Sequence, residues 1–262
     1  FPQWAVDVGL LSNYGLPYYF LKRVEKYLYA TADIIGVQTP VNLKYFNGNV
    51  VYRTARIEVL QNWLAVDNSK TCSIVVENSI LKGRKIFVYA GNMGVAQGLS
   101  LFLDLADSLS TQKSIGFLFV GRGNAVVSLR QAVKARGLDN ILIYDEIEPN
   151  EIHALYQQCA AGIISLDKRH KTHNIPGKFL SYMQSGLPVL AAINSGNDLE
   201  DIINSKNVGC VSTNHSVEGF GNMVEDIVTN LLDEGTKKRC FKLYEDMFSP
   251  KKAVEKIING LV

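Results

Sequence analysis

The chain has 262 residues, of which 47% are hydrophobic and 20% charged, and its formal net charge at pH 7 is +2. This composition is typical of a globular chain with one large domain or two modest ones. No stretch approaches eighteen uninterrupted apolar residues, which excludes a transmembrane helix, and the start has no signal-peptide layout. The net charge argues neither for nor against a nucleic-acid partner, and we expect none.

The cysteines are far apart in the sequence and form no CxxC pair. We therefore expect reduced thiols in a cytoplasmic protein, with neither a zinc site nor a disulfide framework. Because the chain begins with Phe1 rather than methionine, we expect a fragment or a processed product. The cysteines are Cys72, Cys159, Cys210 and Cys240.

The first 65 residues or so carry few elements. The pattern predicts one amphipathic helix at 18–32 and one strand at 33–39, followed by a connector at 51–62 that contains a strand. One helix and one strand cannot build a core. This region either packs on the main domain or is the remnant of a domain whose beginning is missing.

From Lys85 onward, short β-branched and aromatic runs alternate with helical stretches. The strands are apolar on both faces, which favours a sheet covered by helices on each side. With right-handed crossovers, the sequence predicts an α/β fold with a doubly wound parallel sheet of about six strands. The predicted strands are 85–90, 116–121, 141–144, 161–166, 188–192 and 208–212.

Ligands of such sheets bind at the carboxyl ends of the strands, so the turns there are candidate sites. The first turn, AGNMGVAQG at 90–98, has Gly91 and Gly94 where the chain leaves its strand. The amides around Gln97 and Gly98 would then point outward at a helix N-terminus, which is a common anion site. A plain strand-to-helix turn also favours glycine, so this turn alone leaves both interpretations open.

The second turn, GRGNAVV at 121–127, resembles a dinucleotide-binding fingerprint, but Val126 replaces its third glycine. Asp145 and Glu146 follow near the place of a ribose-binding acid. Arg122 is well placed for a phosphate, although a surface salt bridge is an equally good explanation.

The third turn opens a short helix with the triplet Pro176, Gly177, Lys178. Proline suits a first helical turn, glycine permits close approach of a ligand, and the lysine adds a mobile charge to the helix dipole. Ser181 lies one turn further along. A basic loop precedes the triplet, with Lys168, Arg169, His170, Lys171 and His173.

Motifs of several other chemistries are absent from the sequence. There is no GxxxxGK[ST] loop, which excludes a P-loop NTPase, and no GxSxG elbow for acyl transfer. There is also no Asp-x-Asp pair to hold the metal of a Mg²⁺-clamped nucleotide sugar. No convincing nucleophile is present.

Taken in order, the three turns resemble the donor-binding half of a retaining GT-B glycosyltransferase of group 1. The stretch GNMGVAQG…GRG…PGKFLSYMQSGLPVLA resembles the branch that adds sugars such as N-acetyl-fucosamine to lipid-linked intermediates of bacterial surface polysaccharides. The resemblance implies an acceptor-domain tail at 1–46, a connector at 47–67, a Rossmann-like nucleotide-sugar domain at 68–249 and a crossing helix at 250–262. The missing part of the acceptor domain would bind the lipid-linked saccharide. The resemblance is also compatible with a peripheral contact between the protein and the inner face of the plasma membrane.

The resemblance assigns roles to individual residues. Arg122 and Lys178 would act on the diphosphate during transfer, and Ile147 would meet the base, for which we expect uridine, through its backbone. The other donor-binding residues would be Gly91, Asn92, Gly94, Gln97, Gly98, His173, Gly177 and Ser181.

The sequence departs from the family pattern at three places. The arginine and lysine of the first turn fall on Asn92 and Gln97, the Glu-x7-Glu pair falls on His173 and Ser181, and Pro-Gly-Lys replaces Pro-Ser-Lys. These losses shift the diphosphate charge onto Lys178, Arg122 and helix dipoles. We expect no metal or other cofactor, and we expect this chain alone to bind a donor without turnover.

Three alternatives stay open. GRG followed by Asp145 indicates an NAD-dependent oxidoreductase. A GT-B sugar-nucleotide epimerase would share the same cleft. A module that binds a nucleotide sugar or a protein without catalysis would share the same turns.

Overall fold

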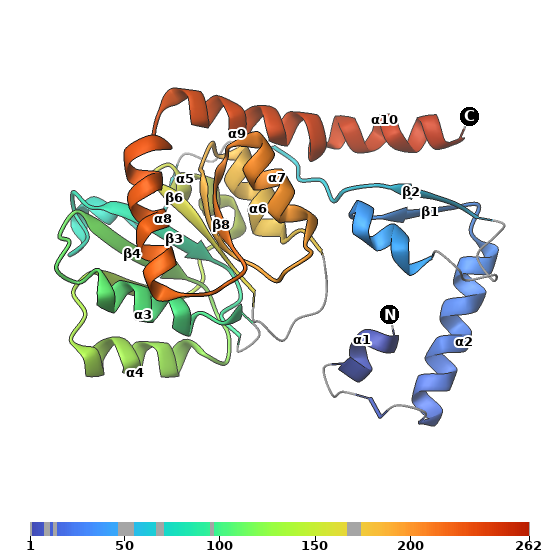
Figure 1. Ribbon diagram of the computed structural model, residues 1–262, viewed down its shortest axis with the longest axis horizontal. Helices are drawn as coiled ribbons and strands as arrows, with labels where there is room; N and C mark the ends of the chain where they lie inside the picture. Colours follow the sequence, from blue (N-terminus) through green and yellow to red (C-terminus); the bar gives the residue numbers. More distant parts are fainter. Residues whose placement is uncertain are drawn as a thin grey trace. The chain divides into compact units, whose positions relative to one another are not determined.

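The structure is a computed structural model that describes residues 2–7, 11–12, 15–46, 55–66, 71–94, 97–166 and 174–261. The chain divides into two compact units (Figure 1). Unit 1 comprises residues 1–61 and 256–262, and unit 2 comprises residues 62–255.

Unit 2 is built on one sheet of six strands in which every neighbouring pair is parallel. The strand order is β5-β4-β3-β6-β7-β8, so the order reverses between β3 and β6. This confirms the predicted doubly wound parallel sheet. The strands are β3 (Lys85–Ala90), β4 (Ile115–Val120), β5 (Ile141–Tyr144), β6 (Ala161–Ser165), β7 (Val189–Ala192) and β8 (Gly209–Ser212).

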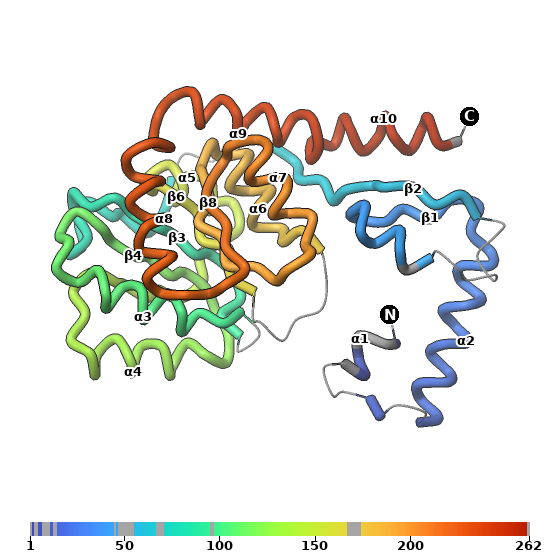
Figure 2. Tube along the Cα trace, viewed as in Figure 1, coloured from blue at the N-terminus to red at the C-terminus, as the bar shows by residue number. Residues whose placement is uncertain are grey.

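Helices cover both faces of this sheet, as the tube in Figure 2 also shows. Successive side chains of a strand point to opposite faces, so Phe87 packs in one core cluster and Val88 in the other. The Phe87 face is covered by α3 (Ser100–Ser108), α4 (Val126–Arg136) and α8 (Val217–Asn230). The Val88 face is covered by α5 (Ile152–Tyr156), α6 (Gly177–Gln184), α7 (Asp198–Lys206) and α9 (Glu234–Met247). Single turns of 3-10 helix lie at η3 (Val76–Asn78) and η5 (Pro149–Glu151).

The helix ends follow from local sequence. Asn197, Ser216 and Asp233 cap α7, α8 and α9 by accepting a hydrogen bond from a first-turn amide. Gly137 ends α4 in the left-handed conformation, at φ 64°, as the sequence predicts for that glycine.

Unit 1 contains a parallel pair of strands, β1 (Ile34–Val37) and β2 (Arg56–Val59). Its small core gathers around the buried side chains of Ile35, Val37 and Phe46. The helix and the two strands predicted for this region are all present, and β2 is the strand expected inside the connector. The remaining elements are α1 (Pro2–Asp7), α2 (Leu16–Thr31), η1 (Pro40–Tyr45) and the end of α10 (Pro250–Leu261).

Within the described ranges, none of the helices combines the length and the apolar character needed to cross a lipid bilayer.

The sheet of unit 2 has no room for a side chain at Gly162 of β6, where an added Cβ would lie 2.5 Å from the ring of the buried Tyr182. Because this ring cannot move without disturbing the core, we expect Gly162→Ala to lower the free energy of unfolding by about 1–3 kcal/mol. Urea denaturation followed by circular dichroism measures the change. Gly221→Ala is the matched control.

An alanine side chain at Gly221, inside α8, would meet no atom within 4 Å. We expect this control substitution to stabilise the protein by about 0.5–1 kcal/mol, because alanine has the higher helix propensity. Equal effects of the two substitutions would contradict the packing described for β6.

Candidate functional site

Three turns at the carboxyl edge of the sheet line one cavity of about 470 Å³. It receives Gly91 and Asn92 after β3, Gly121 and Arg122 after β4, and Glu146 and Ile147 after β5. The first turns of α6 complete it with Lys178 and Ser181. The cavity lies beside the β3/β6 point where the strand order reverses, which is where open parallel sheets bind ligands. Its volume suits a small-molecule site.

The structure brings six of the predicted site residues together in this cavity. They are Gly91, Asn92, Arg122, Ile147, Lys178 and Ser181. Four others, Gly94, Gln97, Gly98 and Gly177, lie in the same turns but are not among its lining residues. His173 lies outside the described residues. The structure therefore assembles most of the predicted set, while the roles assigned to these residues stay predictions.

Gly91 and Lys178 face each other across the cavity. Gly91 adopts φ 132°, a conformation that side chains disfavour, and a Cβ there would lie 3.8 Å from Cε of Lys178. The bare backbone of the first turn and the lysine therefore lie side by side in one cavity.

The first turn is held by its own side chains rather than by an early helix start. The sequence predicts a helix from residue 97, but α3 begins at Ser100, with Leu99 as its N-cap residue. The Gln97 side-chain oxygen instead accepts hydrogen bonds from the Gly94 amide (3.0 Å) and the Asn92 amide group (3.4 Å). The difference arises because a side chain that bonds the turn backbone competes with the helix for the same polar groups.

The second turn packs backbone to backbone on the first. Gly121 has φ 150°, and a Cβ there would lie 1.9 Å from the Gly91 carbonyl oxygen. The Met93 amide donates to the Arg122 carbonyl oxygen at 2.7 Å, which joins the two turns. The partial dinucleotide fingerprint is explained by this contact, because the close approach of two turns demands glycine at residue 121.

Arg122 lines the cavity and also forms an ion pair, so the salt bridge is present and the phosphate contact stays a prediction. Its guanidinium makes two contacts of 3.2 Å with the carboxylate of Glu146, which is also a lining residue. Asp145 pairs with Arg130 at 2.9 Å instead and does not line the cavity. Glu146 is thus the carboxylate that the β5 turn presents to the site.

Lys178 is the second residue of α6, after the N-cap residue Pro176 and Gly177. The sequence predicts Pro176 inside the first turn, and the structure places it one residue earlier, because its ψ of 137° is extended. The Lys178 side chain is partly buried, and the loss of water lowers its pKa to about 8. Within the described residues, no carboxylate lies at ion-pair distance from this ammonium.

Tyr89 is a residue beside the site that sequence reasoning missed. The Lys178 ammonium lies 4.6 Å from the centroid of its ring, and its hydroxyl donates to the Asn92 carbonyl oxygen at 2.6 Å. In the sequence Tyr89 reads as one more apolar residue of the 85–90 strand. Its hydroxyl could have identified it in the sequence, because a buried tyrosine hydroxyl needs a polar partner, here near the end of the strand. The cavity also receives Pro149, Ile152 and Tyr156, which sequence reasoning did not assign to it.

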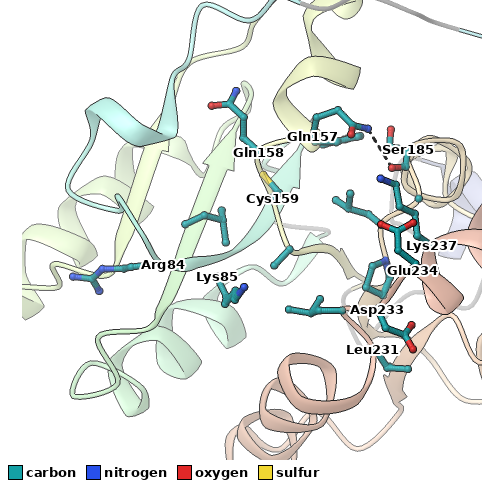
Figure 3. Close-up of a pocket in the computed structure, with 17 residues that line it drawn as sticks. Arg84, Lys85, Gln157, Gln158, Cys159, Ser185, Leu231, Asp233, Glu234 and Lys237 are labelled. Carbon is teal, nitrogen blue, oxygen red and sulfur yellow. Dashed lines mark hydrogen bonds between the residues drawn. The ribbon is translucent and has the colours of Figure 1, made fainter.

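A second cavity, of about 350 Å³, lies at the opposite edge of the same sheet (Figure 3). Lys85 at the start of β3 lines it, together with Cys159 before β6 and Lys237 of α9. In Figure 3 the Gln157 amide reaches the Ser185 carbonyl oxygen, at 3.3 Å. This cavity contains none of the predicted site residues. We therefore assign the candidate site to the carboxyl edge, where parallel sheets bind their ligands.

A family model described as "Glycosyl transferases group 1" matches residues 84–230, which is more than half of the chain. The chain belongs to this family of glycosyltransferases. The matched region contains every strand of the unit 2 sheet and all three turns of the candidate site.

Among known proteins, the probable glycosyltransferase WbjE of Pseudomonas aeruginosa is 22% identical over 218 residues, which cover 80% of this chain and 53% of WbjE. S. aureus TarM, solved with fondaparinux, alpha-GlcNAc-glycerol and UDP, has a TM-score of 0.68 at 18% identity. The alignment covers 91% of this chain and 46% of TarM. Anabaena HepE, solved with UDP and glucose, has a TM-score of 0.69 at 14% identity, with 91% of this chain and 66% of HepE covered. These likenesses establish the GT-B fold. The chain spans about half the length of WbjE and TarM.

The desolvated charge of Lys178 should cost stability. In the folded state its pKa is about 8, below the ordinary 10.5, so the unfolded chain binds more protons between these values. We therefore expect Lys178→Met to raise the free energy of unfolding at pH 7 by about 1–2 kcal/mol. This gain is less than the full pKa difference would give, because the side chain is only partly buried and solvent screens its charge. Urea denaturation measures this, and a destabilised variant would contradict the unpaired charge.

Proposed function

We propose that unit 2 binds the nucleotide diphosphate of a sugar donor, with uridine as the base, for glycosyl transfer. The observation that carries this proposal is the Lys178 ammonium, which has no carboxylate at ion-pair distance among the described residues and faces the bare turn at Gly91 in a cavity at the carboxyl edge. A diphosphate is a polyanion, and an ammonium with no carboxylate partner offers it the strongest attraction. Family membership supports the same ligand class.

The transferred sugar would leave from the terminal phosphate oxygen, on which negative charge grows in the transition state. Lys178 is placed to stabilise that charge, and such fixed donors supply several kcal/mol in other enzymes. Arg122 would contribute after its ion pair with Glu146 rearranges toward the ligand. We propose retention of anomeric configuration, with the departing phosphate as acceptor of the proton from the incoming hydroxyl and with no metal ion.

The whole protein would transfer a sugar such as N-acetyl-fucosamine to a lipid-linked saccharide in surface polysaccharide synthesis, at the cytoplasmic face of the membrane. The likeness to the probable glycosyltransferase WbjE supports the glycosyl transfer itself, and the sequence resemblance described above supports the sugar and the acceptor. The acceptor would be bound by chain beyond this sequence, so we propose that the 262-residue chain binds the donor nucleotide without turnover.

Calorimetric titration with UDP tests the proposal. We expect UDP to bind wild-type protein and Lys178→Ala to weaken its affinity by about tenfold to hundredfold, because a charge-assisted contact to the diphosphate is lost. The matched control is Lys85→Ala, whose lysine lines the cavity at the opposite edge, and its UDP affinity should equal that of wild type.

Equal loss in the two lysine variants would overturn the assignment. NADH binding in place of UDP would favour the oxidoreductase alternative, and a fall of UDP affinity on addition of EDTA would contradict metal-free binding.

The affinity for UDP should depend on pH. A group with a pKa of about 8 is about 90% protonated at pH 7 and about 10% at pH 9, whereas the terminal phosphate, with a second pKa of about 6, is already about 90% ionised at pH 7. We expect UDP affinity of the wild type to fall by about tenfold between these pH values. In Lys178→Arg the affinity should change little, since arginine stays charged. The same pH dependence in both proteins would refute a role for the lysine proton.

A further inference from the structure

Tyr89 contacts two elements of the candidate site at once. Its ring lies under the Lys178 ammonium at 4.6 Å, and its hydroxyl donates to the carbonyl oxygen of Asn92 at 2.6 Å. Lys178 and Asn92 both line the cavity, one from α6 and the other from the turn after β3. One side chain therefore joins two walls that are far apart in sequence.

The position of Tyr89 is fixed by the core. The side chain is fully buried, and its ring packs edge-to-face on Phe119 of β4, with centroids 5.9 Å apart. A ring clamped in this way offers a fixed surface to the flexible lysine chain. The lysine can then keep one position before any ligand arrives, which reduces the ordering cost of binding.

An aromatic ring holds a cation differently from a carboxylate. The ring attracts the ammonium through its quadrupole but does not neutralise it, so the charge stays available to an anion. A carboxylate in the same place would have to be displaced by the phosphates. In the described part of the site Lys178 has the ring and no acid, which suits a cation that must receive a polyanion.

The hydroxyl of Tyr89 acts on the other wall. A free carbonyl oxygen beside the cavity would repel a diphosphate, because it carries partial negative charge. The hydrogen bond from Tyr89 engages the Asn92 oxygen and holds the turn in its present form. The ring and the hydroxyl therefore favour the same ligand by separate contacts.

We propose that Tyr89 is a positioning residue of the diphosphate site, whose ring holds the Lys178 ammonium and whose hydroxyl holds the Asn92 carbonyl oxygen. The inference rests on the proposed function of the cavity. It adds that recognition of the phosphates, rather than of the nucleoside, depends on this buried side chain.

Calorimetric titration of Tyr89→Phe and Tyr89→Leu with UDP and with uridine tests the inference. Phenylalanine keeps the ring and loses the hydroxyl, so we expect UDP affinity to fall by about threefold to tenfold. Leucine loses both contacts, so we expect a fall of about tenfold to hundredfold. Uridine has no phosphate, and its affinity should stay at the wild-type value in both variants.

Tyr182→Phe is the matched control. This buried tyrosine of α6 donates to backbone carbonyl oxygens of β3 and β6 and does not line the cavity. Loss of its hydroxyl should leave the UDP affinity unchanged. If Tyr89→Leu does not fold, as judged by circular dichroism, Tyr89→Phe alone decides the outcome.

The outcomes separate the two proposals. If the wild type binds neither UDP nor uridine, the proposed function fails and this inference fails with it. If the wild type binds UDP but the Tyr89 variants keep its ratio of UDP to uridine affinity, the positioning role is wrong and the proposed function stands. An equal loss of both ligands would show a merely structural role and would also overturn the inference.

Discussion

The candidate site depends on one electrostatic constraint, a lysine charge that is partly buried with no carboxylate at ion-pair distance in the part of the chain that the structure describes. Burial lowers the pKa of Lys178 to about 8, and the Tyr89 ring is the contact that holds its ammonium. Such a group is unfavourable for folding and favourable for binding an anion. The core on the two faces of the sheet offsets the free-energy cost of burying this charge, because it supplies the stability of unit 2.

The fold places this charge where a diphosphate can reach it. Parallel strands direct their following turns to one edge, and the contact between Gly91 and Gly121 brings two of those turns together. The first turn of α6 then adds Lys178 from the other side of the point where the strand order reverses. Because the backbone approaches closely at the glycines, the cavity keeps room for a ligand of nucleotide size.

Much of this arrangement could be predicted from the sequence. The apolar strand runs and the glycines at their ends predicted the sheet of unit 2 and the cavity residues Gly91 and Lys178. The contacts between side chains could not be predicted, because a residue such as Tyr89 cannot be told from a core residue of its strand until its neighbours are known. The start of α3 was misplaced for a related reason, since the Gln97 side chain bonds its own turn. The Arg122–Glu146 pair joins residues of different turns, which sequence spacing alone does not bring together.

The most direct test of the account is the titration of Lys178 itself. With ¹⁵N-labelled lysine, the pH dependence of the Nζ resonance gives the pKa of this side chain with and without UDP, and Lys178→Arg identifies the signal. We expect a midpoint of about 8 in the free protein and a clear rise when UDP is bound, because the phosphates stabilise the charged form. A midpoint that stays the same in saturating UDP would contradict the central claim.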